Sequence, residues 1–88
     1  MPKKSVFTPR NLMPAIAPKR RLKLLTIELD REEDGRWIAD VPDLPGVLVY
    51  GNAKQDALAK VQALALRVLA SKIEEDGTPQ DEVRFVVA

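Results

Sequence analysis

Residues 41–57 read VPDLPGVLVYGNAKQDA, and the fold depends on this stretch because a stiff loop, PDLPG, stands between two apolar runs. The residues that restrict or tighten the loop backbone are Pro42, Pro45 and Gly46. Such residues are typical of a turn that connects two strands. We expect Leu44 to anchor the loop to the core, and Asp43 to accept hydrogen bonds from nearby backbone amides.

The segments around the loop have the alternation of half-buried strands. In LKLLTIELDRE, from residue 22, Leu25, Ile27 and Leu29 share one face and Thr26, Glu28 and Asp30 share the other. Asp34 and Gly35 then offer the positive backbone angles of a tight hairpin turn. RWIADV follows with Trp37, Ala39 and Val41 on one face and Arg36, Ile38 and Asp40 on the other, and VLVYG is a third strand. These three segments predict an antiparallel meander.

A long helix and a last strand follow. Asn52 is the predicted N-cap of a helix from Ala53 to about Glu75, Gly77 its C′ residue, and Pro79 prevents its resumption. The apolar face recurs at three- and four-residue spacing and comprises Ala57, Leu58, Val61, Leu64, Ala65, Val68 and Leu69. EVRFVVA, residues 82–88, alternates again as a strand. The predicted class is α+β, in the order βββαβ, with one long helix on one face of a small antiparallel sheet.

Composition excludes several kinds of chemistry. The chain has no Cys and no His, so disulfides, thiolate or imidazole metal sites and His-based acid–base catalysis are ruled out. The apolar runs are short and broken by charge, and no signal-peptide apolar region opens the chain. We therefore expect a soluble protein of the cytoplasm that has no membrane partner.

Charge is divided unevenly along the chain. Residues 1–23 hold seven basic side chains and no acid, whereas residues 24–88 hold seven basic and thirteen acidic side chains, a net charge of −6. Four prolines interrupt the first part, and we predict a flexible basic arm over 1–21 and a folded domain over 22–88. We interpret the arm as a solvated tail, and the alternative is a segment that contacts nucleic acid. A simpler alternative is that translation starts at Met13, so that part of the arm does not belong to the protein. The candidate phosphate contacts are Lys19, Arg20 and Arg21.

Acidic residues form the most conspicuous constellation of the body. Glu28, Asp30 and Glu32 alternate along one strand, and Asp40 follows on the next. They suggest either a Mg²⁺ site or a solvated acidic face, and we favour the second because the positions lie along a flat surface rather than converging. No nucleophile–base pair is present either, so we predict neither a cofactor nor enzymatic activity. A folded domain of about 65 residues is only marginally stable by itself. We therefore expect a homo-oligomer, either a dimer or a tetramer, whose interface buries part of the sheet face that the helix leaves open.

The pattern over residues 24–80 resembles the HicB-like antitoxin family: a DG hairpin followed by an aromatic residue and Ala, a PDLPG loop, a strand ending in Gly, a helix opening with an acidic-Ala-Leu group, and a G-x-P exit. The residues that carry the resemblance are Asp34, Gly35, Trp37, Ala39, Pro42, Asp43, Leu44, Pro45, Gly46, Gly51, Asp56, Ala57, Leu58, Gly77 and Pro79. The chain departs from the family at Val47, often Cys there, and at Asn52-Ala53, often Asp-Thr.

The resemblance implies a partial RNase H-like fold and an antitoxin that binds a HicA-like toxin, a small basic mRNA-cleaving ribonuclease, and covers its catalytic surface. The chain ends at Ala88, directly after the last strand, so the family's C-terminal DNA-binding module is not expected. The residues predicted to contact the partner are Glu28, Asp30, Glu32 and Asp40. The alternatives are a solitary oligomeric protein without a toxin and, less favoured, a Mg²⁺-dependent RNase H-like nuclease.

Overall fold

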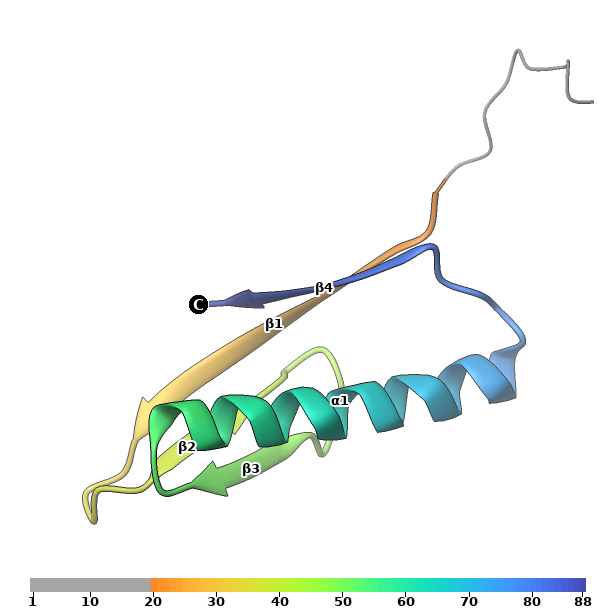
Figure 1. Ribbon diagram of the computed structural model, residues 1–88. Helices are drawn as coiled ribbons and strands as arrows, with labels where there is room; N and C mark the ends of the chain where they lie inside the picture. The colour runs from red at the N-terminus through yellow and green to blue at the C-terminus, as the bar shows by residue number, and fades with distance from the viewer. Residues whose placement is uncertain (1–19) are drawn as a thin grey trace, which may run out of the picture.

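The computed structural model describes residues 20–88, which form four strands and one helix (Figure 1). The elements are β1 (Leu22–Arg31), β2 (Trp37–Asp40), β3 (Leu48–Gly51), α1 (Lys54–Asp76) and β4 (Glu82–Val87). The predicted α+β class and βββαβ order are confirmed. The predicted arm and Lys19 lie outside the described residues, apart from Arg20 and Arg21.

The sheet has the order β3-β2-β1-β4, with β1–β2 and β2–β3 antiparallel and β1–β4 parallel. The three-strand meander is as predicted, but the sheet is mixed rather than wholly antiparallel. The reason is that α1 carries the chain from β3, at one edge, across one face to the opposite edge, where β4 enters parallel to β1 (Figure 1). The helix packs on β3, β2 and β1 and makes little contact with β4.

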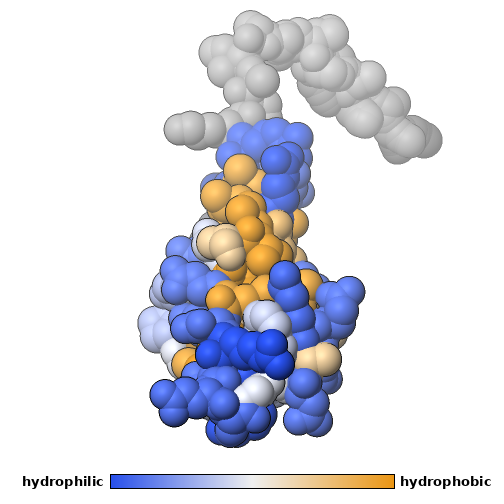
Figure 2. All heavy atoms as spheres, turned by 90° about the vertical axis from the view of Figure 1, so that its left-hand side faces the viewer, coloured by the Kyte–Doolittle hydropathy of each residue, from blue (hydrophilic) through white to orange (hydrophobic). Residues whose placement is uncertain are grey.

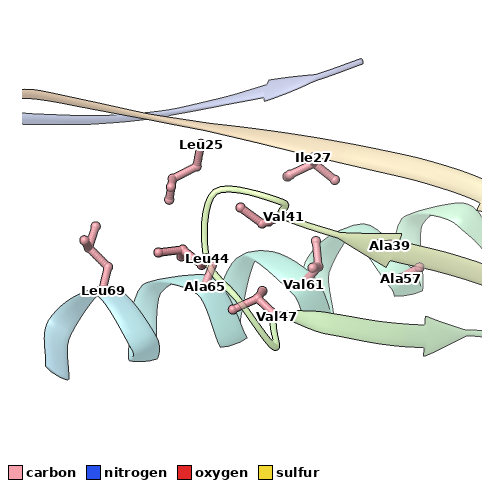
Figure 3. Packing of buried hydrophobic residues seen from close by; sticks show 10 residues of the cluster. All are labelled: Leu25, Ile27, Ala39, Val41, Leu44, Val47, Ala57, Val61, Ala65 and Leu69. Carbon is pink, nitrogen blue, oxygen red and sulfur yellow. The ribbon is translucent and has the colours of Figure 1, made fainter. Parts of the chain in front are cut away.

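One core fills the space between α1 and the sheet, and it is entirely apolar. Figure 3 shows Leu25 and Ile27 pointing from β1 toward α1. The buried residues are Leu25, Ile27, Ala39, Val41, Leu44, Val47, Ala57, Val61, Ala65 and Leu69. Apolar residues recur every second residue on the strands and every three to four residues on the helix, and both sets point into the same core.

The PDLPG loop is a compact turn that belongs to the core. Leu44 is buried, and its N–H donates to the carbonyl of Val41, while the N–H of Val47 donates to the carbonyl of Leu44. Asp43 does not bond within the loop: its carboxylate accepts the backbone N–H of Thr26 in β1 at 3.0 Å. Since the β1–β2 ladder stops at Glu28, the side chain of Asp43 takes the place of a strand beside β1.

The β1–β2 turn differs from the prediction in one respect. Only Gly35 has a positive φ, 94°, and its N–H donates to the carbonyl of Glu32, so the turn is a longer hairpin loop with a single left-handed residue. Glu32 consequently lies beyond the end of β1, in the turn, and not on the strand as predicted. Its own N–H donates to the carbonyl of Arg36 at 2.7 Å, which closes the loop.

The start of α1 also differs from the prediction. The N-cap is Ala53, which makes no side-chain capping bond, rather than Asn52. The carboxylate of Asp56 instead accepts the backbone N–H of Asn52 at 3.1 Å and pairs with Lys60 at 3.1 Å. The bond from Lys60 and then that from Asn52 hold the pKa of Asp56 below its usual value. The helix thus starts one residue later than predicted, and the N–H that Asp56 accepts belongs to Asn52, which precedes the N-cap.

The other helix boundary is as predicted, and the first turn of the helix lies very close to β3. At the C-terminus Gly77 has a φ of 68° and donates its N–H to the carbonyl of Ile73. At the N-terminus the backbone of Ala57 approaches Gly51 so closely that no side chain fits there. Within residues 20–88, no helix is long and apolar enough to cross a membrane.

Candidate partner-binding face

The side of the sheet opposite α1 carries a mixed acidic and apolar surface, which we call the open face. Its residues are Glu28, Asp30, Ile38, Asp40, Leu48 and Tyr50. The strand register sets them in two rows across the sheet: Glu28 lies opposite Asp40, which lies opposite Leu48, and Asp30 lies opposite Ile38, which lies opposite Tyr50. Residues that are paired in register project from the same side, so these six side chains form one surface.

The acids of the open face repel one another. Glu28 and Asp40 are direct cross-strand neighbours, and like charges in this position destabilise a sheet. Within residues 20–88, neither of them nor Asp30 forms an ion pair. The carboxylate of Asp30 accepts the backbone N–H of Arg31 at 2.9 Å, whereas those of Glu28 and Asp40 are left to water or to a cation from another molecule.

Two apolar residues of the open face, Leu48 and Tyr50, are exposed, and the third, Ile38, is half-buried. Leu48 retains 47% and Tyr50 42% of its accessible surface, and Leu24, further along β1, retains 48%. Acidic and large apolar side chains thus stand side by side on a sheet surface that α1 does not cover.

The ring of Tyr50 lies beside a cation. The guanidinium of Arg36 lies 4.5 Å from the centre of its ring, and the carboxylate of Asp34 accepts the Nε–H of Arg36 at 2.8 Å. The backbone N–H of Arg36, and then its side chain, hold the pKa of Asp34 below its usual value. Asp34 thus accepts two hydrogen bonds from Arg36, one from the backbone N–H and one from the side chain.

A second aromatic–cation group, which the sequence analysis missed, surrounds Trp37. Arg31 lies 5.6 Å and Lys54 5.9 Å from the ring centre. Arg31 is the register partner of Trp37 across β1–β2, so the hairpin pairing was the available signal for it. Lys54 arrives from the first turn of α1, and no local pattern in the sequence places it there. Trp37 is half-buried and packs against the core.

Three of the four predicted partner-contacting acids lie together, and the fourth lies apart. Glu28, Asp30 and Asp40 share the open face, whereas Glu32 sits in the hairpin turn. In the part of the chain that the structure describes, no three acidic side chains cluster closely enough to hold a metal ion. The open face is therefore a dispersed charged surface, suited to binding by charge and contact area.

The basic residues at the start of the described chain lie beside acids. Arg20 pairs with Glu82 at 3.2 Å, and the backbone N–H of Arg21 donates to the carboxylate of Asp81 at 2.7 Å. The carbonyl of Arg21 accepts the N–H groups of both Asp81 and Glu82. These contacts fasten the entry to β1 against the entry to β4.

The chain is similar to UPF0150 protein Ta0767 of Thermoplasma acidophilum, with 27% identity over 62 residues, which cover 69% of this chain and 90% of that protein. No family model matches the chain, and no solved structure matches it. The match therefore covers most of a small protein and about two thirds of this chain.

Proposed function

We propose that the chain is an antitoxin-like binding module whose open face engages a small basic ribonuclease and covers the surface on which that enzyme binds RNA. In this proposal the chain performs no chemistry itself, and inhibition is steric and electrostatic. The observation that carries it is the group of three carboxylates, Glu28, Asp30 and Asp40, set among exposed apolar side chains.

The electrostatics of the face support a cationic partner. The opposed pair Glu28 and Asp40 is unneutralised within the described chain, so a Lys or Arg from a partner would relieve an existing repulsion as well as form a new contact. The net charge of −6 over residues 24–88 would also accelerate encounter with a cationic protein. The resemblance of residues 24–80 to the HicB-like antitoxins implies the same class of partner.

The first step of the test is to search the reading frames beside the gene for one that encodes a short, basic ribonuclease. That protein is co-expressed with the chain, and the complex is captured on a tag. The decisive variant is Glu28→Lys with Asp40→Lys, which reverses the charge of the face while it keeps two like charges opposite each other, so stability is closely matched. The control is Glu74→Lys with Glu75→Lys, the same change in net charge at the exposed end of α1.

We expect the wild type and the control to retain the ribonuclease on the tag and to restore the growth of cells that express it. The open-face variant should bind the ribonuclease at least about tenfold more weakly. Association should also slow as salt is raised. Equal binding by the two charge-reversed variants would refute the role of the open face. A neighbourhood without such a ribonuclease would favour a solitary self-associating protein instead.

A further inference from the structure

The strand β4 differs from the rest of the fold in having no buried residue. Val83, Val86 and Val87 are 36%, 43% and 48% exposed, and Phe85 is half-buried. The strand forms one end of the sheet, and α1 makes little contact with it. In Figure 1 the arrow of β4 points to the left. Figure 2 views the molecule from that side and shows a band of apolar surface between hydrophilic flanks.

The hydrogen bonds of β4 reveal which residues face the free edge. The N–H of Glu82 donates to the carbonyl of Arg21, and the N–H of Ala88 donates to the carbonyl of Ile27. Because the bonding direction alternates along a strand, the even-numbered residues of β4 bond to β1. The N–H and C=O groups of Val83, Phe85 and Val87 therefore point outward, where no strand among residues 20–88 meets them.

We propose that the outer edge of β4 pairs with β4 of a second copy of this chain, antiparallel about a two-fold axis at Phe85. The outward residues read Val-Phe-Val, which is symmetric about Phe85. In this register Phe85 lies opposite its own copy and Val83 lies opposite Val87, so every outward backbone group exchanges hydrogen bonds with the second chain. A different partner strand would have no reason to match this symmetry.

Charge also selects a second copy. The charged residues of β4 are Glu82 and Arg84, which pair with each other at 2.7 Å, so the edge is neutral although the body carries −6. Two identical acidic bodies repel least where they meet at such an edge. The strand β4 contains no Pro or Lys, and its register with β1 runs without a bulge, so these common obstacles to self-pairing are absent from it.

The inference goes beyond the proposed binding of a ribonuclease, because it uses a different surface. The pairing joins two four-stranded sheets into one and brings Val83, Phe85 and Val87 of both copies together on one side. The acidic rows of the open face lie on β1, β2 and β3, away from the edge. A dimer of this kind would present two open faces and could hold two partner molecules.

The test compares two double variants of the full chain by analytical ultracentrifugation over a range of concentrations. Val83→Lys with Val87→Lys sets like charges opposite each other at both symmetric pairs, whereas Val83→Glu with Val87→Lys sets opposite charges there. We expect the wild type to be a dimer, the Glu/Lys variant to remain one, and the Lys/Lys variant to dissociate about tenfold more readily or further. A monomeric wild type, or equal behaviour of the two variants, would overturn the proposal.

A second measurement covers the case in which the Lys/Lys variant does not fold, as judged by circular dichroism. The chain has no Cys, so Arg84→Cys with Val86→Cys introduces the only thiols, and the register sets residue 84 opposite residue 86 of the second copy. Mild oxidation should give a disulfide-linked dimer faster than either single Cys variant does. Absence of that difference would contradict the register.

Discussion

Gly51→Ala should be severely destabilising, because α1 leaves no room for a side chain at this position. A Cβ built on Gly51 would lie 2.5 Å from the backbone N and 2.8 Å from the Cα of Ala57, and 2.9 Å from a carboxylate oxygen of Asp56. The first two contacts are with backbone, which cannot rotate away. The whole first turn of α1 would have to move off β3.

The size of the effect follows from the cost of overpacking. Forcing extra atoms into a packed site costs typically about 1–3 kcal/mol, and we expect the upper end because rigid backbone is displaced. For a domain of this size about 1 kcal/mol lowers Tm by about 4–8 °C, so the expected fall is about 12–24 °C. Gly51 does not have a positive φ, and the effect is therefore one of space and not of backbone conformation.

The assay is urea and thermal unfolding of the wild type, Gly51→Ala and a control, Gly35→Ala. A Cβ at Gly35 meets nothing within 4 Å, but its φ of 94° strains any other residue. That strain should cost about 1–2 kcal/mol. If Gly51→Ala proves no more destabilising than Gly35→Ala, the close approach of α1 to β3 is not a constraint and the reasoning is wrong.

Four further outcomes are expected. Leu44→Ala should lower the free energy of unfolding by about 2–5 kcal/mol, measured by urea titration, since a buried anchor is lost. Asp43→Ala should cost about 1 kcal/mol and Asp43→Asn less, because the amide keeps an acceptor oxygen for β1. Because the pKa of Asp56 is lower in the folded state, this carboxylate stabilises the fold above its unfolded pKa, near 3.8, and the stabilisation is lost as the pH falls through the folded pKa. In Asp56→Asn, the free energy of unfolding should therefore fall less steeply on acidification, as measured by unfolding at a series of pH values. Glu28→Gln should raise stability by about 0.2–1 kcal/mol by removing the repulsion from Asp40, while it weakens partner binding in the capture assay.

The faces of the strands and the helix could be predicted from the sequence because periodicity is a local property. Leu25 and Ile27 were assigned to the core, and Ile38 and Asp40 to the opposite side, from alternation alone. The end of the helix at Gly77 was equally local, since a glycine with a proline two residues later is a common helix end.

Features that depend on distant residues could not be predicted in the same way. The parallel pairing of β4 with β1 joins segments about sixty residues apart, and nothing in either strand specifies which edge the other occupies. The bond from Thr26 to Asp43 and the approach of Lys54 to Trp37 have the same origin. For the candidate face, the sequence supplied the acids, but the pairing of Glu28 with Asp40 and the separation of Glu32 required the register.

The ten-residue β1 is divided between two neighbours without overlap: Leu22–Ile27 pair with β4, and Glu28–Arg31 pair with β2. The strand is continuous, yet its two halves belong to different ladders and can open separately. In hydrogen exchange, detachment of β4 should release the amides of Leu25 and Ile27 while those of the meander stay protected. Slower exchange confined to Leu22–Ile27 would then indicate that a second chain holds β4 in place. This signal is separate from the exchange of the meander, which reports the stability of the rest of the domain.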